Sequence, residues 1–492
     1  MKENEKNPAA ALSAGNLKKI FSNCYDFEIR KLDLGGAGRL SGWVCFIDGL
    51  VSGIAVAEDV IRPITDSDRF GKIKDPAQAA QLILDGLVYS YTVRRRTDTD
   101  TVTSDLLNGF CAVFIDGFPG CLTFEVRSEE KRGIDTPAEE KVVKGSKDAF
   151  NEIIKINTML IRRKLKDKDL KIEQVTLGDR TETFVTIVYI DGFTNKAIVN
   201  KVRRRLNKIK TDGILTSADI EENISDDPRS PFPQLITTER PDKFCLNILE
   251  GRVGILADGL PIGYLAPGTF SQFFKVPEDR AGHFTSATVL TVLRYAALLI
   301  TLLLPAFYVA VAMYHQEMLP TKLMQSIIRS KQSVPFPTAV EVLLMLISFE
   351  LLQEAGLRLP DPIGETVSII GALIVGQSAV EAKVVSPVVI IVVAIAGIAG
   401  YTMPNQDMGA ALRLCRFILV IAAILAGMYG LAVAMCLLIY HLCSLESFGV
   451  PYMTPFVQNE GKDIIKAISR SPVSESSNPE PALAGNKNSG EE

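Results

Sequence analysis

The sequence predicts an α/β soluble N-terminal region of two repeated subdomains, followed by an α-helical membrane domain with several spans. The first observation is a split in charge. Among the 492 residues, charged side chains are dense in 1–283 and sparse in 284–457, where long apolar runs appear. The second is a turn motif that recurs four times in the charged half. The split excludes a purely soluble or disordered chain, and the net charge of −4 argues against a general nucleic-acid binder.

The recurring motif is a β-rich apolar run, an Asp-Gly pair and a second apolar run. Asp-Gly tolerates the positive φ angles of a two-residue turn, so each copy predicts a β-hairpin. Successive pairs lie about 70 residues apart, a spacing that favours repeated α/β units over one long meander. The alternative is chance recurrence of a common turn. The four predicted turns are Asp48-Gly49, Asp116-Gly117, Asp191-Gly192 and Asp258-Gly259.

We place two soluble subdomains at 21–138 and 139–284, after a flexible N-terminus of residues 1–20. The N-terminus lacks an apolar core of the signal-peptide type, so we expect the soluble region to stay on the cytoplasmic side. Prolines and acids at 221–239 predict an irregular connector.

Helices are expected between the turns. Residues 146–167 carry an apolar stripe, and Ser146 is a suitable N-cap. Residues 196–210 carry a second stripe with a very basic opposite face. That basic face is either solvated or in contact with an acidic neighbour or anionic lipid headgroups.

The membrane domain is predicted at 285–457. Three uncharged runs, 295–314, 384–403 and 417–440, are each long enough to cross a slab of roughly 30 Å at about 1.5 Å per residue. Residues 366–380 are fewer and rich in small side chains, which favours a span packed against protein.

An amphipathic helix is predicted at about 338–357, because this apolar segment carries Glu341, Glu350 and Glu354. A carboxylate near the bilayer centre costs on the order of 3 kcal/mol, so the segment should not face lipid alone. Glu350 and Glu354 are four residues apart and share a helix face. We expect the segment at the interface, along a wet cavity or inside an oligomer, sheltered by sister copies or companion chains.

Four spans plus this helix place both termini on the same side. The basic residues Lys322, Arg329 and Lys331 disagree with that topology, because they would then lie outside. Five spans are therefore the alternative. The polar residues 458–492 predict a tail that is mostly disordered.

Motifs that carry catalytic chemistry are absent from the sequence. The three histidines lie far apart, and no HExxH, CxxC or Cys/His cluster occurs, so no metal site and no cofactor is predicted. Phosphate-binding, nucleophile-elbow and kinase motifs are missing too, so we predict no catalytic residue and no enzyme. The eight cysteines are interpreted as reduced thiols. A disulfide between Cys111 and Cys121, which flank one predicted hairpin, is the alternative.

Three long blocks resemble a known family. They are SPFPQLITTERPDKFCLNILEGRVGILADGLPIGYLAPGTF at 230–270, VPFPTAVEVLLMLISFELLQEAGLRLPDPIGETVSIIGALIVGQSAVEAKVVSP at 334–387, and EEKVVKGSKDAFNE at 139–152. They are similar, in this order along the chain, to blocks of bacterial spore germination proteins, the A subunits of GerA-type germinant receptors. The likeness extends from about residue 24 to residue 455.

The resemblance implies a multi-pass protein of the spore inner membrane with its soluble domain on the core side. It also implies assembly with a transporter-like B subunit and a lipoprotein C subunit, and oligomerisation of the A subunit. Such a complex senses nutrients and triggers ion release and germination. The family brings no catalytic residue, and no ligand-binding residue can be assigned from it.

Two mechanisms follow for the predicted glutamate face. In the first, several copies of the chain build an ion pathway in which Glu350 and Glu354 line the pore or act in gating, since rings of carboxylates favour cations. The alternative for these residues is a structural role, in which the acids pair with Arg358 or cap neighbouring helices. In the second mechanism, the chain is a transducer without a pore, and its soluble domains relay a signal from the B subunit to another channel. A secondary-transporter component is a further alternative, because membrane-buried acids also serve coupled transport.

Overall fold

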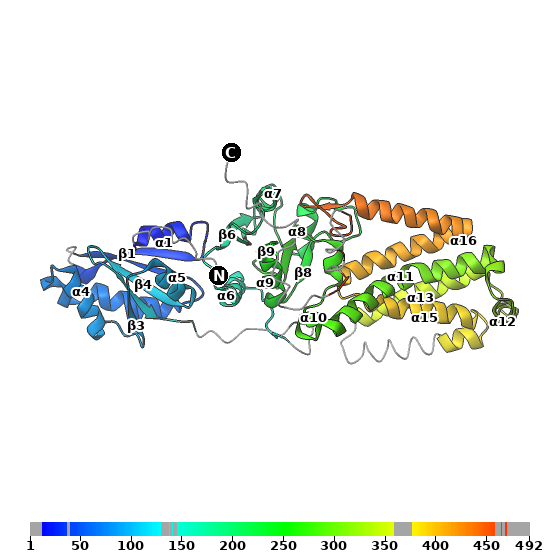
Figure 1. Ribbon diagram of the computed structural model, residues 1–492, viewed down its shortest axis with the longest axis horizontal. Helices are drawn as coiled ribbons and strands as arrows, with labels where there is room; N and C mark the ends of the chain where they lie inside the picture. The colour runs from blue at the N-terminus through cyan, green and yellow to red at the C-terminus, as the bar shows by residue number, and fades with distance from the viewer. Residues whose placement is uncertain are drawn as a thin grey trace. The chain divides into compact units, whose positions relative to one another are not determined.

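The computed structural model describes residues 12–36, 40–128, 137, 140, 145–358, 376–457, 464 and 468–469. The chain forms two compact units (Figure 1). The soluble unit comprises residues up to Ser225 together with Leu235–Pro267, and the helical unit comprises Asp226–Gln234 and the chain from Gly268. The predicted soluble half and membrane half are therefore separate bodies, and the predicted connector contributes residues to the helical one.

The first half of the soluble unit is built on a five-stranded antiparallel sheet. Its strands follow the order β1-β2-β4-β5-β3. Helices cover both faces, because successive side chains of the central strands enter two different apolar clusters. The strands are β1 (Phe27–Asp33), β2 (Ser41–Ile47), β3 (Val93–Arg96), β4 (Phe110–Ile115) and β5 (Cys121–Glu125), and the helices are α1 (Ala14–Ile20), α2 (Gly53–Ala55), α3 (Arg62–Asp66), α4 (Pro76–Leu82) and α5 (Thr99–Leu107).

The second half of the soluble unit repeats this plan. Its sheet follows the order β6-β7-β9-β10-β8, which matches the first sheet strand for strand. In both halves, two strands lead into helices, and a third strand, one helix and a hairpin follow. The strands are β6 (Leu170–Leu177), β7 (Thr183–Ile190), β8 (Ile236–Thr238), β9 (Val253–Ala257) and β10 (Gly263–Ala266), and the helices are α6 (Ile154–Lys164), α7 (Lys196–Leu206), α8 (Ser217–Ile224) and α9 (Pro241–Leu249). The predicted pair of repeated α/β subdomains is confirmed.

The four Asp-Gly turns share their backbone geometry but not their place in the fold. Gly49, Gly117, Gly192 and Gly259 all have φ between 76° and 85°. The second and fourth pairs join true hairpins, β4 to β5 and β9 to β10. The first and third pairs instead end β2 and β7 and lead into helices, so the prediction of a hairpin at Asp48-Gly49 and Asp191-Gly192 is wrong.

The reason lies downstream of those two turns. Asp48 and Asp191 each accept a hydrogen bond from the N–H of the following glycine, which closes the turn locally. A helix cap then follows within a few residues, because Ser52 caps α2 and Asn195 caps α7. The turn motif therefore predicts the reversal of the chain, and the cap decides that a helix follows it.

Helix α6 connects the two subdomains of the soluble unit. Its first turn is held by the Asp258 carboxylate, which accepts a hydrogen bond from the Ile154 N–H at 3.0 Å. Its side chains Met159 and Leu160 complete an apolar cluster of the first subdomain. The predicted helix at 146–167 is therefore too long, and Ser146 is not its N-cap, since the Ser146 hydroxyl donates to Asp148 instead.

A fully buried ion pair fixes α6 against the first subdomain. The Arg162 guanidinium donates to both carboxylate oxygens of Asp26, at 2.8 and 3.0 Å, and to the Leu170 carbonyl at 3.0 Å. The two side chains are only 1% and 3% exposed. A charge removed from water to this degree needs a partner with good geometry, and the paired donors of arginine supply it.

The helical unit contains α11 (Phe284–Tyr314), α12 (Thr321–Lys331), α13 (Thr338–Arg358), α15 (Pro387–Gly400) and α16 (Gln406–Ser444). Helices α11 and α16 have the length and hydropathy that crossing a membrane requires, and α15 is a shorter apolar helix. Of the predicted run at 366–380, residues 366–375 lie outside the described part of the chain. The number of spans therefore stays a prediction.

Helix α16 is not one straight rod. Ala426 and Gly427 leave helical geometry, and Gly427 has a φ of 59°. A side chain at Gly430 would collide with the Ala422 carbonyl, although the two residues would lie about 12 Å apart along a straight helix. The chain therefore reverses, and 406–425 and 428–444 form two arms that meet at the turn (Figure 1). The predicted span at 417–440 therefore contains this reversal and is not one continuous helix.

The reversal is held at the end of α11. The Tyr314 hydroxyl donates to the Ile424 carbonyl at 2.6 Å, and a Cβ atom at Gly427 would lie only 3.0–3.1 Å from atoms of His315 and Tyr314. Glycine suits this position because it combines a positive φ with a close approach of neighbouring side chains. Composition alone could not show the turn, since the whole segment is uniformly apolar.

We expect Asp26→Asn to destabilise the soluble unit by about 3–5 kcal/mol, because it leaves the buried Arg162 without a counter-charge. Trp43 is the single tryptophan of the chain and lies in β2, so its fluorescence during urea titration reports the unfolding of the first subdomain. The control is Arg62→Gln, which breaks an exposed pair with Glu58 and should leave the urea midpoint unchanged. Equal midpoints for the two variants would show that the buried pair has no stabilising role.

Candidate functional site: an ion-pair cluster inside the helical unit

The predicted glutamate segment forms α13, which packs against α15 and α11 within the helical unit. Its apolar side chains Val342, Met345 and Leu346 are buried in that contact. The acidic residues of α13 therefore meet groups of their own chain, and each needs a separate description.

Glu350 forms ion pairs with two arginines of α16. The Arg413 Nε lies 2.7 Å from Glu350 Oε1, and the Arg416 Nη2 lies 3.3 Å from Glu350 Oε2. Arg416 is 4% exposed, Arg413 is 26% exposed and Glu350 is 34% exposed. The cluster thus extends from the interior of the bundle, at Arg416, to its surface, at Glu350.

The two arginines were missed at the level of sequence, because they precede the apolar run that predicted a span. Their spacing of three residues places them on one face of α16 and is the signal that could have found them. That signal gives no partner, since Glu350 is distant in sequence. The predicted partner Arg358 has no described side chain.

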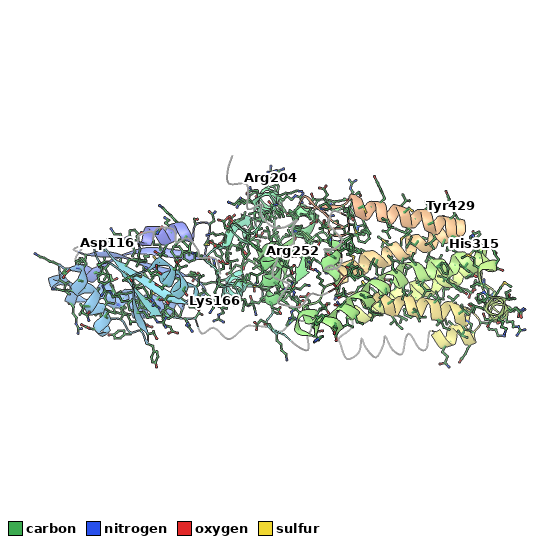
Figure 2. All side chains as sticks on the ribbon, viewed as in Figure 1. Asp116, Lys166, Arg204, Arg252, His315 and Tyr429 are labelled. Carbon is green, nitrogen blue, oxygen red and sulfur yellow. The ribbon has the colours of Figure 1, made fainter. Side chains whose placement is uncertain are left out.

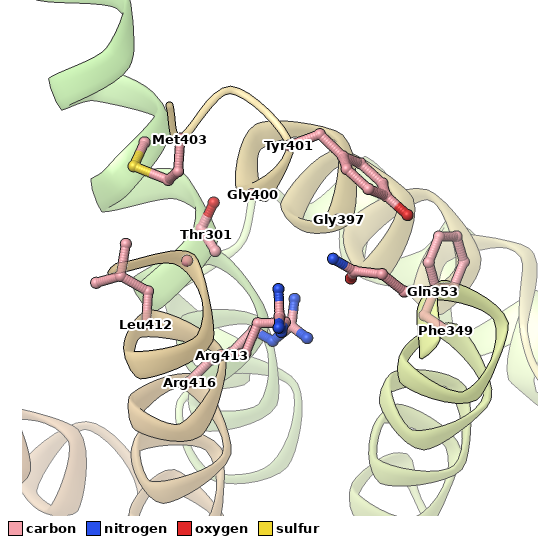
Figure 3. A pocket seen from close by; sticks show the side chains of 11 residues that line it. Thr301, Phe349, Gln353, Gly397, Gly400, Tyr401, Met403, Leu412, Arg413 and Arg416 are labelled. Atoms are coloured by element: carbon pink, nitrogen blue, oxygen red, sulfur yellow. The ribbon is translucent and has the colours of Figure 1, made fainter. Parts of the chain in front are cut away.

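Figure 3 shows a small pocket beside the cluster. Both guanidinium groups extend into it from α16, and Gln353 and Tyr401 approach from α13 and from the end of α15. Thr301 of α11 closes another side. The Nε of Arg416 is buried and has no hydrogen-bond partner within the part of the chain that the structure describes.

The other two acids of α13 have different surroundings. Glu341 is buried, accepts a hydrogen bond from the Ser386 N–H at 2.8 Å, and lies 3.7 Å from the Lys331 ammonium. Glu354 lies one turn beyond Glu350 and is exposed. The chain itself supplies partners for Glu341 and Glu350. Shelter of the segment by sister copies or companion chains stays a prediction.

The basic face predicted for 196–210 is only partly free of protein contacts. Arg203 of α7 holds Glu173 with two hydrogen bonds of 2.8 and 2.9 Å, and Arg205 donates to the Ile224 carbonyl. Arg204 is exposed on the same helix (Figure 2). Arg203 and Arg205 therefore contact groups of the second subdomain and stabilise its fold.

The cysteines are all free thiols, and Cys111 and Cys121 form no disulfide. Burial raises the pKa of the Cys45 thiol to about 12, and burial also raises the pKa of Cys111 and Cys121 well above the ordinary value of a thiol. Thiols of this kind are poor nucleophiles. Over the described part of the chain, no three His, Cys, Asp or Glu side chains are grouped so that they could hold a metal ion.

A second charged cluster lies in the first subdomain. Asp105 of α5 accepts hydrogen bonds from Arg96, at 2.7 and 3.1 Å, and from the Thr123 hydroxyl at 2.8 Å. Burial alone would raise the pKa of Asp105, but these hydrogen bonds outweigh it, so the pKa lies below its ordinary value of 3.8. The cluster ties α5 to strands β3 and β5.

A sequence model of the Bacillus/Clostridium GerA spore germination protein family matches residues 15–481. The uncharacterised membrane protein YfkQ of Bacillus subtilis is 37% identical over 452 residues, which cover 91% of this chain and 87% of that protein. Spore germination protein KA of Bacillus subtilis is 37% identical over 466 residues, covering 95% of this chain and 85% of that protein.

A solved structure is also similar. It is the crystal structure of the N-terminal domain of the A subunit of the Bacillus megaterium spore germinant receptor GerK3, with a TM-score of 0.44 and 29% identity. The alignment covers 54% of this chain and 99% of that domain.

We expect Glu350 to be coupled energetically to Arg413. Loss of a hydrogen bond between charged groups costs roughly 1.5–3 kcal/mol, so Glu350→Gln should lower the stability of the helical unit by about that amount. A double-mutant cycle with Arg413→Gln in detergent, followed by circular dichroism, measures the coupling. Glu354→Gln is the matched control and should show no coupling to Arg413. Additive effects of Glu350→Gln and Arg413→Gln would contradict the pairing.

Acid should weaken the first subdomain through Asp105. A carboxyl whose folded pKa is depressed contributes stability that is complete above its unfolded pKa and is lost as pH falls through the folded value. We therefore expect the urea midpoint reported by Trp43 to fall steeply below about pH 4. Asp105→Asn should start from a lower midpoint at pH 6 and change less below pH 4. Parallel pH curves for the two proteins would exclude Asp105 as the cause.

Proposed function

Because the chain belongs to the GerA family of spore germination proteins, we propose that it is the A subunit of a nutrient germinant receptor. It sits in the spore inner membrane with its soluble unit on the core side and relays nutrient sensing to ion release and germination. The support is the family match over nearly the whole chain, together with curated relatives that are themselves spore germination proteins.

The partners in this proposal are a transporter-like B subunit, a lipoprotein C subunit, further copies of this chain and membrane lipid. The apolar helices α11 and α16 support a membrane location. No reaction chemistry is assigned to the chain, and its role in the receptor is conformational rather than enzymatic.

We assign the chain the role of an oligomeric ion-conducting element. In this mechanism Glu354 lines the pathway, since it is exposed on α13 and equivalent residues surround the axis of a symmetric oligomer. Glu350 acts in gating, because its ion pairs with Arg413 and Arg416 hold α13 against α16. Loosening these pairs would free α13 to move. The observation that carries the gating role is that Glu350 has arginine partners within its own chain.

The alternative is a transducer without a pore, in which the same ion pairs transmit a movement to another channel. A secondary-transporter component would use the acids for coupled transport. The ion pairs of Glu350 suit the transducer as well as the gate, so conduction has to be measured directly. Purified chain reconstituted in liposomes conducts ions under the first mechanism and does not under the transducer mechanism.

In spores, we expect Glu354→Gln to slow potassium release after nutrient addition about tenfold, the effect of roughly 1.4 kcal/mol on a barrier. Glu350→Gln should instead change the nutrient concentration or delay at which release begins, because it weakens the closed arrangement. Flame photometry of the medium measures release, and immunoblots verify equal protein levels. Lys322→Gln is the control outside the pathway. Normal release by Glu354→Gln spores would remove this residue from the pathway.

A further inference from the structure

The charge in the ion-pair cluster does not balance. Arg413 and Arg416 together carry two positive charges, and in the described part of the chain their ion pairs are with Glu350 alone. One positive charge is left over beside apolar helices. Buried charges in proteins are normally compensated, because leaving one alone in a low-dielectric medium is costly.

The uncompensated charge lies on the interior side of the cluster. Arg416 is 4% exposed, and its Nε is a buried donor that finds no hydrogen-bond partner among the described residues. A buried donor left unsatisfied loses its hydration and gains nothing in exchange. The ion-pair cluster therefore has two defects, a buried donor without a partner and an excess positive charge, and the pocket lies beside it.

The size of the pocket restricts what could correct them. Its cavity volume is about 20 Å³, and roughly 10–15 Å³ is the least that admits one water molecule. Amino acids and sugars are too large for this space. A water molecule fits this space but carries no charge, so it would leave the excess positive charge uncompensated. A small monovalent anion would supply the missing negative charge beside the two arginines that line the pocket.

We propose that this pocket is a binding site for a small monovalent anion of chloride size. The Arg413 and Arg416 guanidinium groups hold the anion, and the Gln353 amide and Tyr401 hydroxyl are the uncharged groups on the opposite walls. Residues of α13, α15 and α16 line the site, so a bound anion would hold these three helices together. It is independent of the proposed role in germination.

The first test measures thermal unfolding of the purified full-length chain in detergent. Sodium chloride is compared with sodium gluconate at equal ionic strength, because gluconate is too large for the pocket. A site that binds only in the folded state raises the midpoint with chloride concentration, by a few degrees, and bromide should act like chloride. Arg416→Gln should remove the difference between the two salts, whereas Lys322→Gln, on exposed α12, should keep it.

Two results of this test would overturn the proposal. One is an identical midpoint in chloride and gluconate, which means that water alone occupies the pocket. The other is an unchanged chloride effect in Arg416→Gln. Should Arg416→Gln fail to fold, chloride-35 NMR of the unmodified chain gives an independent answer. Line broadening that bromide reverses and gluconate does not supports the site, and absence of such broadening refutes it.

Discussion

A charge that leaves water must meet an opposite charge, and this constraint organises both units of the molecule. In the soluble unit, the paired Arg162 and Asp26 fix α6 against the first subdomain. In the helical unit, Glu350 meets Arg413 and Arg416, and this contact joins α13 to α16. Each pair connects segments that are distant in sequence. The charged side chains therefore specify which elements pack together, whereas the apolar ones supply most of the burial.

The duplicated soluble unit shows how one plan accommodates different sequences. Both sheets have the same strand order and the same positive φ at the glycine of each Asp-Gly pair. Helix α6 contacts both halves. Asp258 of the second subdomain accepts a hydrogen bond from the first turn of α6, and Met159 of the same helix is buried in the core of the first subdomain. A helix shared in this way makes the two subdomains one compact unit.

The structure of the helical unit differs most from what hydropathy alone predicts. Its last apolar segment contains a reversal at Ala426 and Gly427 and forms two arms. The arms return the chain so that Leu442 and Tyr452 are buried in the same unit as the connector Asp226–Gln234, where Gln234 accepts a hydrogen bond from Ser447. The connector is therefore part of the packing of the helical unit, although its prolines and acids predicted an irregular link.

The sequence by itself determined the two-part organisation, the internal repeat, the Asp-Gly turns and the helical glutamate segment. These features depend on local patterns: charge density, periodicity and turn residues that act within a few positions. Only the tertiary structure decided that two of the four turns lead into helices, that α16 folds back at Gly427, and that Glu350 has arginine partners. These outcomes depend on which distant segments come into contact. Such contacts produce no periodic pattern in a single sequence, so they could not be predicted from it.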